Sequence, residues 1–198
     1  MSPVLNKIKD EVRENLPYKY PEVYGTEADD IIAVLCKEYQ NEDIMIVSAD
    51  KDFIQLHKYP KVKQHSPNTK KLVNGFDPDV YIKEHILKGD RSDGVPNVLS
   101  DDNVFVEGRR QKPLTKKKME SWFDRMELTL EDSPTFTEEE QKNYDRNRKL
   151  IDLSLIPPEL EAKIYNEFNE VKVAHRSKIL NYFITRKLKT LIEVIDEF

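Results

Sequence analysis

Apolar residues follow two different patterns in the first part of the chain. Between residues 27 and 39 they recur at helical spacing, which predicts an amphipathic helix with Thr26 as its N-cap. Residues 44–47 form a short continuous apolar run between polar residues, which predicts a buried parallel strand. Two more short strands are expected at residues 62–65 and 71–73, on either side of a Pro-Asn turn. Because helix and strand alternate here, this part is predicted to be an α/β domain.

The rest of the chain, after residue 77, shows helical spacing and no strand pattern. The predicted helices span residues 80–87, 115–128, 138–150, 158–168 and 174–193. The expected fold class is therefore α/β, with part of a parallel-sheet domain at residues 1–77 and a helical domain at residues 78–198. The aromatic residues at helical spacing are expected in the core, namely Trp122, Tyr144, Tyr165, Phe168, Tyr182 and Phe183.

Charge is unevenly distributed, although the formal net charge is only −5. Residues 109–118 and 172–189 each hold six basic residues and no acid, whereas residues 127–140 hold six acids and no base. Basic tracts within an acidic total fit a protein that grips a polyanion with part of its surface. A single charged run is more often just a solvated helix face, so the tracts suggest nucleic-acid binding without establishing it.

Membrane and secreted classes are not supported by the sequence. The longest apolar run, Ile31 to Cys36, is far shorter than the ~20 residues that span a bilayer. The first residues lack the apolar stretch of a signal peptide. The single cysteine, Cys36, forms no internal disulfide, which fits a reducing compartment such as the cytoplasm. No membrane partner is expected.

Carboxylates gather in three short clusters, at residues 27–30, 50–52 and 89–93, and they are the candidates for chemistry. The chain has no phosphate-binding glycine loop, no zinc-ligand spacing among its four histidines and no serine-hydrolase elbow. Each acidic cluster also has an ordinary structural explanation. Acids in the first turn of a helix stabilise it, and aspartates beside glycines are common in turns.

The position of Asp50 and Asp52 favours a functional interpretation of their cluster. Both follow directly on the predicted strand at residues 44–47, and ligand sites lie beyond the carboxyl ends of parallel strands. Carboxylates gathered there repel one another unless a cation is bound, and oxygen ligands favour Mg²⁺ or Mn²⁺. Two such ions are a common device for phosphodiester hydrolysis. Together with the basic tracts, this pattern predicts a metal-dependent nuclease.

Three sequence blocks resemble, in order, the signature blocks of the 5′-nuclease (flap endonuclease) superfamily. They read YGTEADD at residues 24–30, SADKDFIQL at 48–56 and GDRSDGVP at 89–96. The stretch at residues 52–60, residues 150–152 and the last three residues look especially like the ribonuclease H branch of T-even bacteriophages. The resemblance runs from about residue 4 to the last residue. If the chain is phage-encoded, the host cytoplasm is its expected location.

The resemblance implies a metal-dependent 5′→3′ exonuclease and flap endonuclease with RNase H activity. Such enzymes remove RNA primers and adjacent DNA from lagging-strand fragments, so the expected substrates are RNA–DNA hybrids, flaps and nicked duplex DNA. The implied cofactors are two Mg²⁺ ions, for which Mn²⁺ can substitute.

By the same resemblance, the acidic clusters divide between two metal sites. Glu27 and Asp29 would serve the first site, with Asp30 in support. Asp50 and Asp52 would serve the second, joined by Asp90 and Asp93 directly or through water. The implied catalytic residues are Asp29, Asp50 and Asp52.

Residues 79–118 would form the family's helix–loop–helix element, which holds duplex DNA and often a K⁺ ion. Asn97-Val98-Leu99-Ser100 replaces the glycine-rich turn usual there, so the K⁺ site is in question. Contacts of this kind position the substrate backbone without reading its sequence. The expected nucleic-acid contacts are Arg109, Arg110, Lys112, Lys116, Lys117 and Lys118.

The chain departs from the family before the block that contains Glu27. Family members carry there a strand with an aspartate, a second aspartate and an arch, whereas only 26 residues precede Glu27. The chain is therefore expected to match the C-terminal two-thirds of such a nuclease, to be weak or inactive alone, and to need an N-terminal nuclease fragment. A sliding clamp and a single-strand-binding protein are further expected partners. The alternative is a non-catalytic nucleic-acid-binding module or a subunit of a split nuclease.

Overall fold

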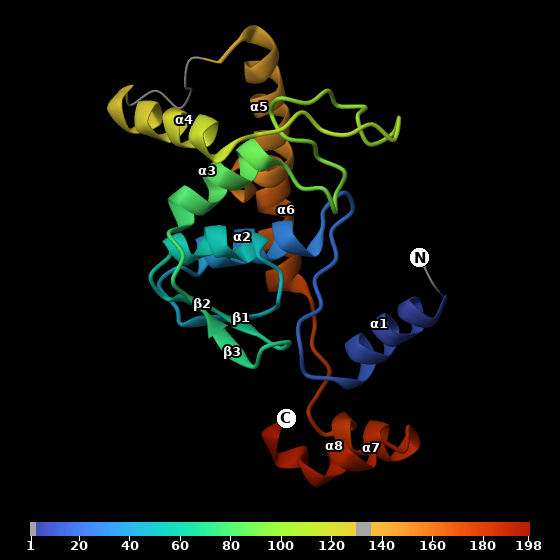
Figure 1. Cartoon of the computed structure of the whole chain (residues 1–198). Helices are drawn as coiled ribbons and strands as arrows, with labels where there is room; N and C mark the ends of the chain where they lie inside the picture. The colour runs from blue at the N-terminus through green and yellow to red at the C-terminus, as the bar shows by residue number, and fades with distance from the viewer. Residues whose placement is uncertain (1–2, 130–135) are drawn as a thin grey trace. The chain divides into compact units, whose positions relative to one another are not determined.

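The computed structural model describes residues 3–129 and 136–198, which divide into two compact units (Figure 1). Unit 1 comprises Met1–Val34 and Pro157–Phe198, and unit 2 comprises Leu35–Ile156. Helix α2 (Ala28–Glu38) runs from the first unit into the second. The domain boundary expected near residue 77 falls inside unit 2. It stays a prediction, because it marks where the sequence pattern changes, whereas the two units are defined by contacts between residues.

Unit 1 is helical among its described residues. Besides the start of α2 it contains α1 (Pro3–Asn15), α6 (Pro158–Glu170), α7 (Lys178–Thr185), α8 (Lys189–Glu193) and the 3-10 helix η3 (Ile195–Glu197). Helix α1 packs against α7. Glu11 of α1 accepts a hydrogen bond from the Tyr182 hydroxyl at 2.8 Å and also pairs with Arg186. These contacts join the two ends of the described chain.

The single helix predicted at residues 174–193 is wrong, because α7 and α8 are separate. Lys187 adopts φ 57° in the left-handed region. The N–H of Leu188 donates to Phe183 O at 2.9 Å, and that of Lys187 donates to Ile184 O at 3.1 Å. This pair of bonds is the Schellman pattern that ends a helix. Apolar spacing continues across the break, so periodicity alone did not reveal it.

Unit 2 contains a three-stranded sheet in the order β1-β2-β3. Strand β1 (Ile44–Val47) runs parallel to β2 (Val62–Ser66), which pairs antiparallel with β3 (Lys71–Val73). All three predicted strands are confirmed. The prediction that residues 44–47 are buried is wrong in part, because only Ile46 is buried while Met45 and Val47 are 50% and 68% exposed. Side chains alternate between the two faces of a strand, so one face of β1 points away from the core.

Helices form the core of unit 2, beside the sheet. They are α3 (Pro78–Lys88), α4 (Lys116–Thr129) and α5 (Glu138–Ile151), and α3 packs on α5. Their buried cluster consists of Ile86, Leu87, Val95, Val98, Met119, Trp122, Tyr144 and Ile151. Burial of one large apolar side chain contributes about 1.5–3 kcal/mol, so this cluster supplies much of the unit's stability.

Most predicted features of the helical part are confirmed. Helices at 80–87, 115–128, 138–150 and 158–168 correspond to α3, α4, α5 and α6, and the α/β fold class holds. Trp122, Tyr144 and Phe183 are buried as expected, whereas Tyr165 is 42% exposed, so its core assignment is wrong. Within the described ranges, no helix combines the length and apolar character that a bilayer span requires.

Candidate metal centre

Asp52 is the first residue of η1 (Asp52–Lys58), a 3-10 helix that follows the carboxyl end of β1. The side chains of η1 that are buried are Phe53, Ile54, Gln55 and Leu56. Gln55 ties η1 to the end of α5, since its Nε2 donates to Ile151 O at 3.2 Å and its Oε1 accepts from Leu153 N at 2.9 Å. Asp52 is therefore anchored through its own helix.

The turn between β1 and η1 is held by a buried side chain of β2. Nε2 of Gln64, which is 1% exposed, donates to Ser48 O at 2.9 Å and to Asp50 O at 2.6 Å. One Asp50 oxygen accepts the backbone N–H of Asp52 at 3.0 Å. The turn thus presents Asp50 and Asp52 in fixed relation.

Asp90 lies in a tight turn just after α3, and Gly89 makes this turn possible. Gly89 has φ 68° and ψ 179°, a conformation almost confined to glycine. A Cβ there would meet Val95 O at 2.4 Å and Pro96 O at 2.6 Å. Oδ1 of Asp90 accepts the backbone N–H of Ser92 at 2.7 Å and also its hydroxyl. The second oxygen, Oδ2, makes neither of these bonds and is available to other groups.

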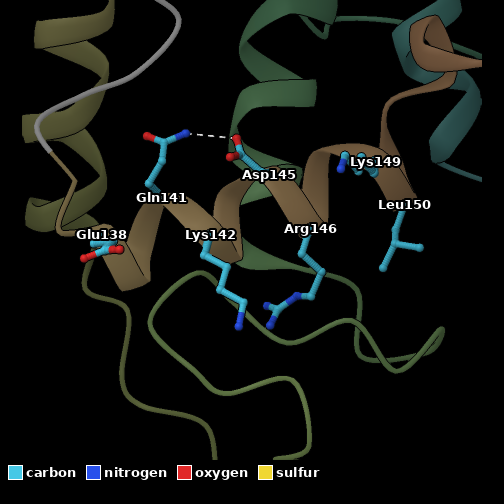
Figure 2. Close-up of a pocket in the computed structure, with 7 residues that line it drawn as sticks. All are labelled: Glu138, Gln141, Lys142, Asp145, Arg146, Lys149 and Leu150. Atoms are coloured by element: carbon cyan, nitrogen blue, oxygen red, sulfur yellow. Dashed lines mark hydrogen bonds between the residues drawn. The ribbon is translucent and has the colours of Figure 1, made fainter.

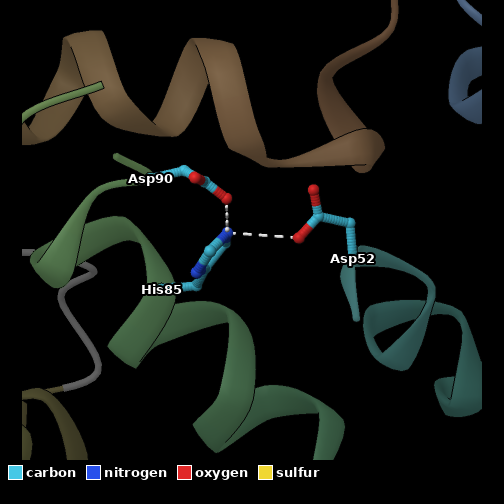
Figure 3. A group of neighbouring side chains, drawn as sticks. All are labelled: Asp52, His85 and Asp90. Atoms are coloured by element: carbon cyan, nitrogen blue, oxygen red, sulfur yellow. Dashed lines mark ion pairs between the residues drawn. The ribbon is translucent and has the colours of Figure 1, made fainter. Parts of the chain in front are cut away.

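Asp52 and Asp90 meet at His85, in the last turn of α3 (Figure 3). His85 Nε2 lies 3.2 Å from Asp52 Oδ1 and 3.5 Å from Asp90 Oδ2. Neither approach has the direction of a hydrogen bond, so buried Nε2 has no hydrogen-bond partner among the described residues. One ligand atom from each of the three residues falls within 4.8 Å of the others. Two carboxylates and an imidazole in this arrangement suit a divalent cation.

Close charges shift the pKa values at this centre. The approach of the Asp52 carboxylate raises the pKa of His85 most, and although burial opposes it, the charges of Asp52, Asp90 and Asp93 add to the rise. For Asp90, burial favours a higher pKa, but hydrogen bonds from Ser92 and the Asp93 N–H outweigh it and lower the pKa. Asp90 is therefore held ionised beside the imidazole.

The neighbouring groups feel the same negative potential. Burial raises the pKa of Tyr81 to about 12, and the charges of Asp52, Asp50 and Asp90 contribute. The pKa of Asp93 is also raised, by burial first and then by Asp90, Asp52 and Asp50. Four carboxylates thus act on one region of unit 2, which is the condition under which a cation relieves their repulsion.

Asp50 and Asp93 lie at the rim of this centre and are exposed. Asp50 also lines a hollow of about 440 Å³ beside β3, together with Lys51, Thr69 and Phe76. The structure therefore brings Asp52 and Asp90 into ligand distance of one another. Asp50 and Asp93 are close enough to act through charge.

The remaining predicted metal residues, Glu27, Asp29 and Asp30, belong to unit 1 at the start of α2. Asp30 Oδ2 accepts the backbone N–H of Glu27 at 2.9 Å. The predicted N-cap Thr26 is wrong by one residue, because its hydroxyl donates to Val23 O at 2.9 Å. Glu27 occupies the cap position and Asp30 stabilises it from the third helical residue.

His85 was absent from the residues expected from the sequence. The four histidines have no ligand spacing in sequence, so none stood out. One signal existed: His85 lies four residues before Gly89, so in a helix ending there it shares a face with the position from which the Asp90 turn begins. Its partner Asp52 comes from a distant segment, which spacing alone does not indicate.

Residues 97–112 form a long loop whose two ends are fastened together. Asn97 Nδ2 donates to Lys112 O at 2.9 Å, and the Asn97 N–H donates to Gln111 Oε1 at 2.6 Å. The Lys112 N–H donates to the Ser100 hydroxyl at 2.9 Å, and that hydroxyl donates to Asn97 Oδ1 at 2.9 Å. Asn97 and Ser100, which stand where a glycine-rich turn was expected, close this loop.

Four of the six predicted nucleic-acid contacts form ion pairs. Arg109 lies 2.8 Å from Glu107, Lys112 3.6 Å from Glu139, Lys116 3.5 Å from Glu120 and Lys118 2.7 Å from Glu140. Arg110 and Lys117 are exposed and have no acidic partner within the ranges that the structure covers. These two cations are therefore the most available for phosphate.

Helix α5 supplies side chains that bond backbone carbonyls from the end of α3 to the start of this loop. Asn147 Nδ2 donates to Ile86 O and Pro96 O, both at 2.8 Å, and Asn143 Nδ2 donates to Val98 O at 3.1 Å. Arg146 also donates to Pro96 O, at 3.1 Å. These bonds fix the backbone on both sides of the Asp90 turn, and the K⁺ site stays a prediction.

A hollow of about 710 Å³ runs along the length of α5 (Figure 2). Gln141 and Asp145 bond to each other on its wall at 2.9 Å. Its other lining residues are Glu138, Lys142, Arg146, Lys149 and Leu150. Their mixed charges converge on no common point, so the hollow is not assigned a chemical role.

Known proteins match this chain over both of its parts. A sequence family described as T4 RNase H, C terminal, matches residues 76–198, and one described as 5′-3′ exonuclease, N-terminal resolvase-like domain, matches residues 2–85. Ribonuclease H of Enterobacteria phage T4 is 38% identical over 200 residues, which cover 98% of this chain and 65% of the relative. DNA polymerase I of Streptococcus pneumoniae is 35% identical over 115 residues, 46% of this chain and 13% of the polymerase.

The fold is also found in a solved structure of a T5 5′-exonuclease mutant. The match has a TM-score of 0.50 and 20% sequence identity, and it covers 75% of this chain and 67% of that one. The chain spans 65% of the length of T4 ribonuclease H and far less of the polymerase. Because the first family matches more than half of its residues, the chain belongs to the family defined by the C-terminal domain of T4 RNase H.

Proposed function

We propose that this chain provides part of the active site and the duplex grip of a metal-dependent 5′-nuclease with RNase H activity. The observation that carries the proposal is the meeting of Asp52 and Asp90, from two separate sequence blocks, around His85. The names of the relatives, a ribonuclease H and a 5′-exonuclease, support the reaction class. RNA–DNA hybrids, flaps and nicked duplex DNA are the proposed substrates.

The carboxylates of unit 2 would hold a divalent ion, with Mg²⁺ or Mn²⁺ as the proposed cofactor. The buried Nε2 of His85 lacks a hydrogen-bond partner in the described chain, so the donor set fits a cation. Asp52 and Asp90 would bind it, with Asp50 and Asp93 acting from the rim. Bound there, the ion would polarise a phosphodiester and acidify a water. Glu27 and Asp29 are proposed to serve the other ion of the pair, with Asp30 in support through its bond to the Glu27 N–H.

Cleavage of a 5′-labelled RNA–DNA hybrid and of a 5′-flap, with and without Mg²⁺, tests this function. Asp50→Ala removes a rim carboxylate and is expected to lower the release of short 5′ products. Asp43→Ala, an exposed acid of the same unit, is the matched control and should leave cleavage unchanged. A parallel arm adds an N-terminal fragment of a related phage nuclease, since the chain spans 65% of its relative.

Two outcomes would contradict the proposal. Cleavage by Asp50→Ala at the parent rate would show that the reaction does not depend on this carboxylate cluster. Salt-sensitive binding without cleavage in any arm would favour the non-catalytic binding module.

The duplex grip is proposed to depend on the unpaired cations of residues 110–117. Replacement of Arg110 and Lys117 by alanine should lower the slope of log affinity against log salt by about 2, because two phosphate contacts are lost. Arg109→Ala should change the slope less, because Glu107 already neutralises that guanidinium. Fluorescence anisotropy with a nicked duplex at several salt concentrations measures both. Equal slopes for the two variants would refute this assignment.

A further inference from the structure

The imidazole of His85 is held in one orientation by its surroundings. Its ring stacks on Tyr81, with ring centres 5.6 Å apart and planes 20° apart, and Phe76 packs edge-on against Tyr81. The carbonyl of His85 accepts the Gly89 N–H at 2.8 Å, at the end of α3. The next two residues, Ile86 and Leu87, are buried in the core. The position of Nε2 is therefore fixed by the packing of the ring and of α3.

The distances around Nε2 match those between ligands that share one ion. Metal bonds of about 2.1 Å separate two ligand atoms by roughly 3.0 Å at an octahedral angle and roughly 3.5 Å at a tetrahedral angle. Nε2 lies 3.2 Å from Asp52 Oδ1 and 3.5 Å from Asp90 Oδ2. A proton on Nε2 points to neither oxygen well enough for a hydrogen bond. A metal ion between the three atoms would be coordinated by all of them.

We propose that His85 Nε2 is a ligand, with Asp52 and Asp90, of one divalent ion, and that this ligand makes the site prefer Mn²⁺ to Mg²⁺. The inference rests on the proposed function for the presence of a cation at these carboxylates. Mg²⁺ is a hard ion that favours oxygen, whereas imidazole suits first-row transition metals. A nitrogen ligand in an otherwise carboxylate site therefore shifts selectivity toward the transition ion.

Pulsed electron paramagnetic resonance of Mn²⁺ bound to the full chain tests the proposal without any substitution. A bound imidazole couples its nitrogen to the metal, and labelling histidine with ¹⁵N changes the coupling frequency. We expect this coupling in the parent chain and its loss in His85→Gln. His175→Gln removes an exposed histidine and should keep the coupling. Absence of histidine coupling in the parent chain would overturn the proposal.

Affinities separate a ligand from a simple counter-ion. A ligand role predicts that His85→Gln and His85→Lys both weaken Mn²⁺ binding by at least about 10-fold, the loss that even an outer-shell partner causes, with a smaller effect on Mg²⁺. If His85 served as a cation between two carboxylates, His85→Gln would bind Mn²⁺ as tightly as the parent or more so, which would refute the inference. Circular dichroism melts confirm that each variant is folded, and the labelled parent chain remains decisive if one is not.

The inference and the proposed function fail in different ways. Histidine coupling without cleavage of any substrate supports the ligand and refutes the nuclease. Carboxylate-dependent cleavage in Mg²⁺ without histidine coupling to Mn²⁺ supports the nuclease and refutes the His85 ligand.

Discussion

The acidic turn after α3 and the acidic start of α2 use their carboxylates differently. In both, an aspartate accepts a backbone N–H: Asp90 from Ser92 at 2.7 Å, and Asp30 from Glu27 at 2.9 Å. The two oxygens of Asp90 have different contacts: Oδ1 accepts the N–H bonds that stabilise the turn, whereas Oδ2 lies 3.5 Å from His85 Nε2. Asp30 uses its bonded oxygen to stabilise the first turn of its own helix.

The difference shows that one carboxylate can have a structural and a chemical role together. One of its oxygens then accepts a backbone N–H while the other stays available to a metal ion. Acid-rich turns therefore cannot be sorted by sequence into structural and functional classes. What distinguishes Asp90 is that its second oxygen faces His85, which Asp52 from a distant segment also approaches.

The largest expected effect separates Asp52 from Asp30. Asp52→Asn removes a proposed metal ligand and should lower cleavage by about a thousandfold, equivalent to roughly 4 kcal/mol of transition-state stabilisation. Asp30→Asn keeps an oxygen that can accept the Glu27 N–H and should change cleavage by less than about tenfold. Single-turnover rates on a flap substrate measure both. Equal losses would place Asp30 among the metal ligands and break the comparison.

The next effect concerns the backbone of the two turns. Gly89→Ala should cost about 3 kcal/mol or more of unfolding free energy, since it adds a backbone clash to a strained conformation. Gly25→Ala, with φ 84° but nothing within 4 Å of the added Cβ, should cost about 1 kcal/mol. Urea denaturation of both variants gives the difference. Similar costs would show that the Asp90 turn relaxes around the new methyl group.

A smaller effect is expected from the helix-capping role of Asp30. Asp30→Ala leaves the Glu27 N–H without its acceptor and should lower the unfolding free energy by about 0.5–1 kcal/mol. Thermal melts compare it with Thr26→Ala, which removes the residue first expected to cap. A larger loss for Thr26→Ala would reverse the assignment.

The smallest effect involves Glu140, an acid that caps α5 and has no proposed chemistry. Burial opposes ionisation, but hydrogen bonds from Lys118 and Thr137 outweigh it, so the pKa of Glu140 is below its usual value of 4.5. The stabilisation is complete above about pH 4.5 and is lost as the pH falls through the lowered pKa. Glu140→Gln should cost about 0.5 kcal/mol at pH 7 and nothing at acidic pH. Melts at a series of pH values from 7 down to 2 test this, and a difference that stays constant over the whole series would exclude the charge as its source.

The sequence predicted most elements because their signals are local. The strand at residues 44–47 and the helix that became α5 carry periodicity within one segment, and a capping box marks the start of α5 at Thr137. The 3-10 helix η1 was not foreseen, since its seven residues are too few to show a period. The break at Lys187 also escaped, because a left-handed lysine has no sequence signature.

Only one part of the candidate site was predictable from the sequence, namely the carboxylates that follow the end of a predicted strand. Asp52 follows β1, so its location was foreseen, whereas its meeting with Asp90 depends on α3 packing beside η1. His85 was missed because its ligand partners come from outside its own helix. Contacts of this kind arise from tertiary packing, which one sequence does not encode as a pattern.

Two buried amide side chains, Gln55 of η1 and Asn147 of α5, link both Asp52 and Asp90 to helix α5. Gln55 bonds the carboxyl end of α5 and so anchors the helix that carries Asp52. Asn147 bonds carbonyls on both sides of the Asp90 turn, at Ile86 and Pro96. Local opening of α5 would release both anchors, and the two carboxylates would leave their positions together. Opening of α5 is therefore expected to weaken metal binding by both carboxylates together and not by one of them alone.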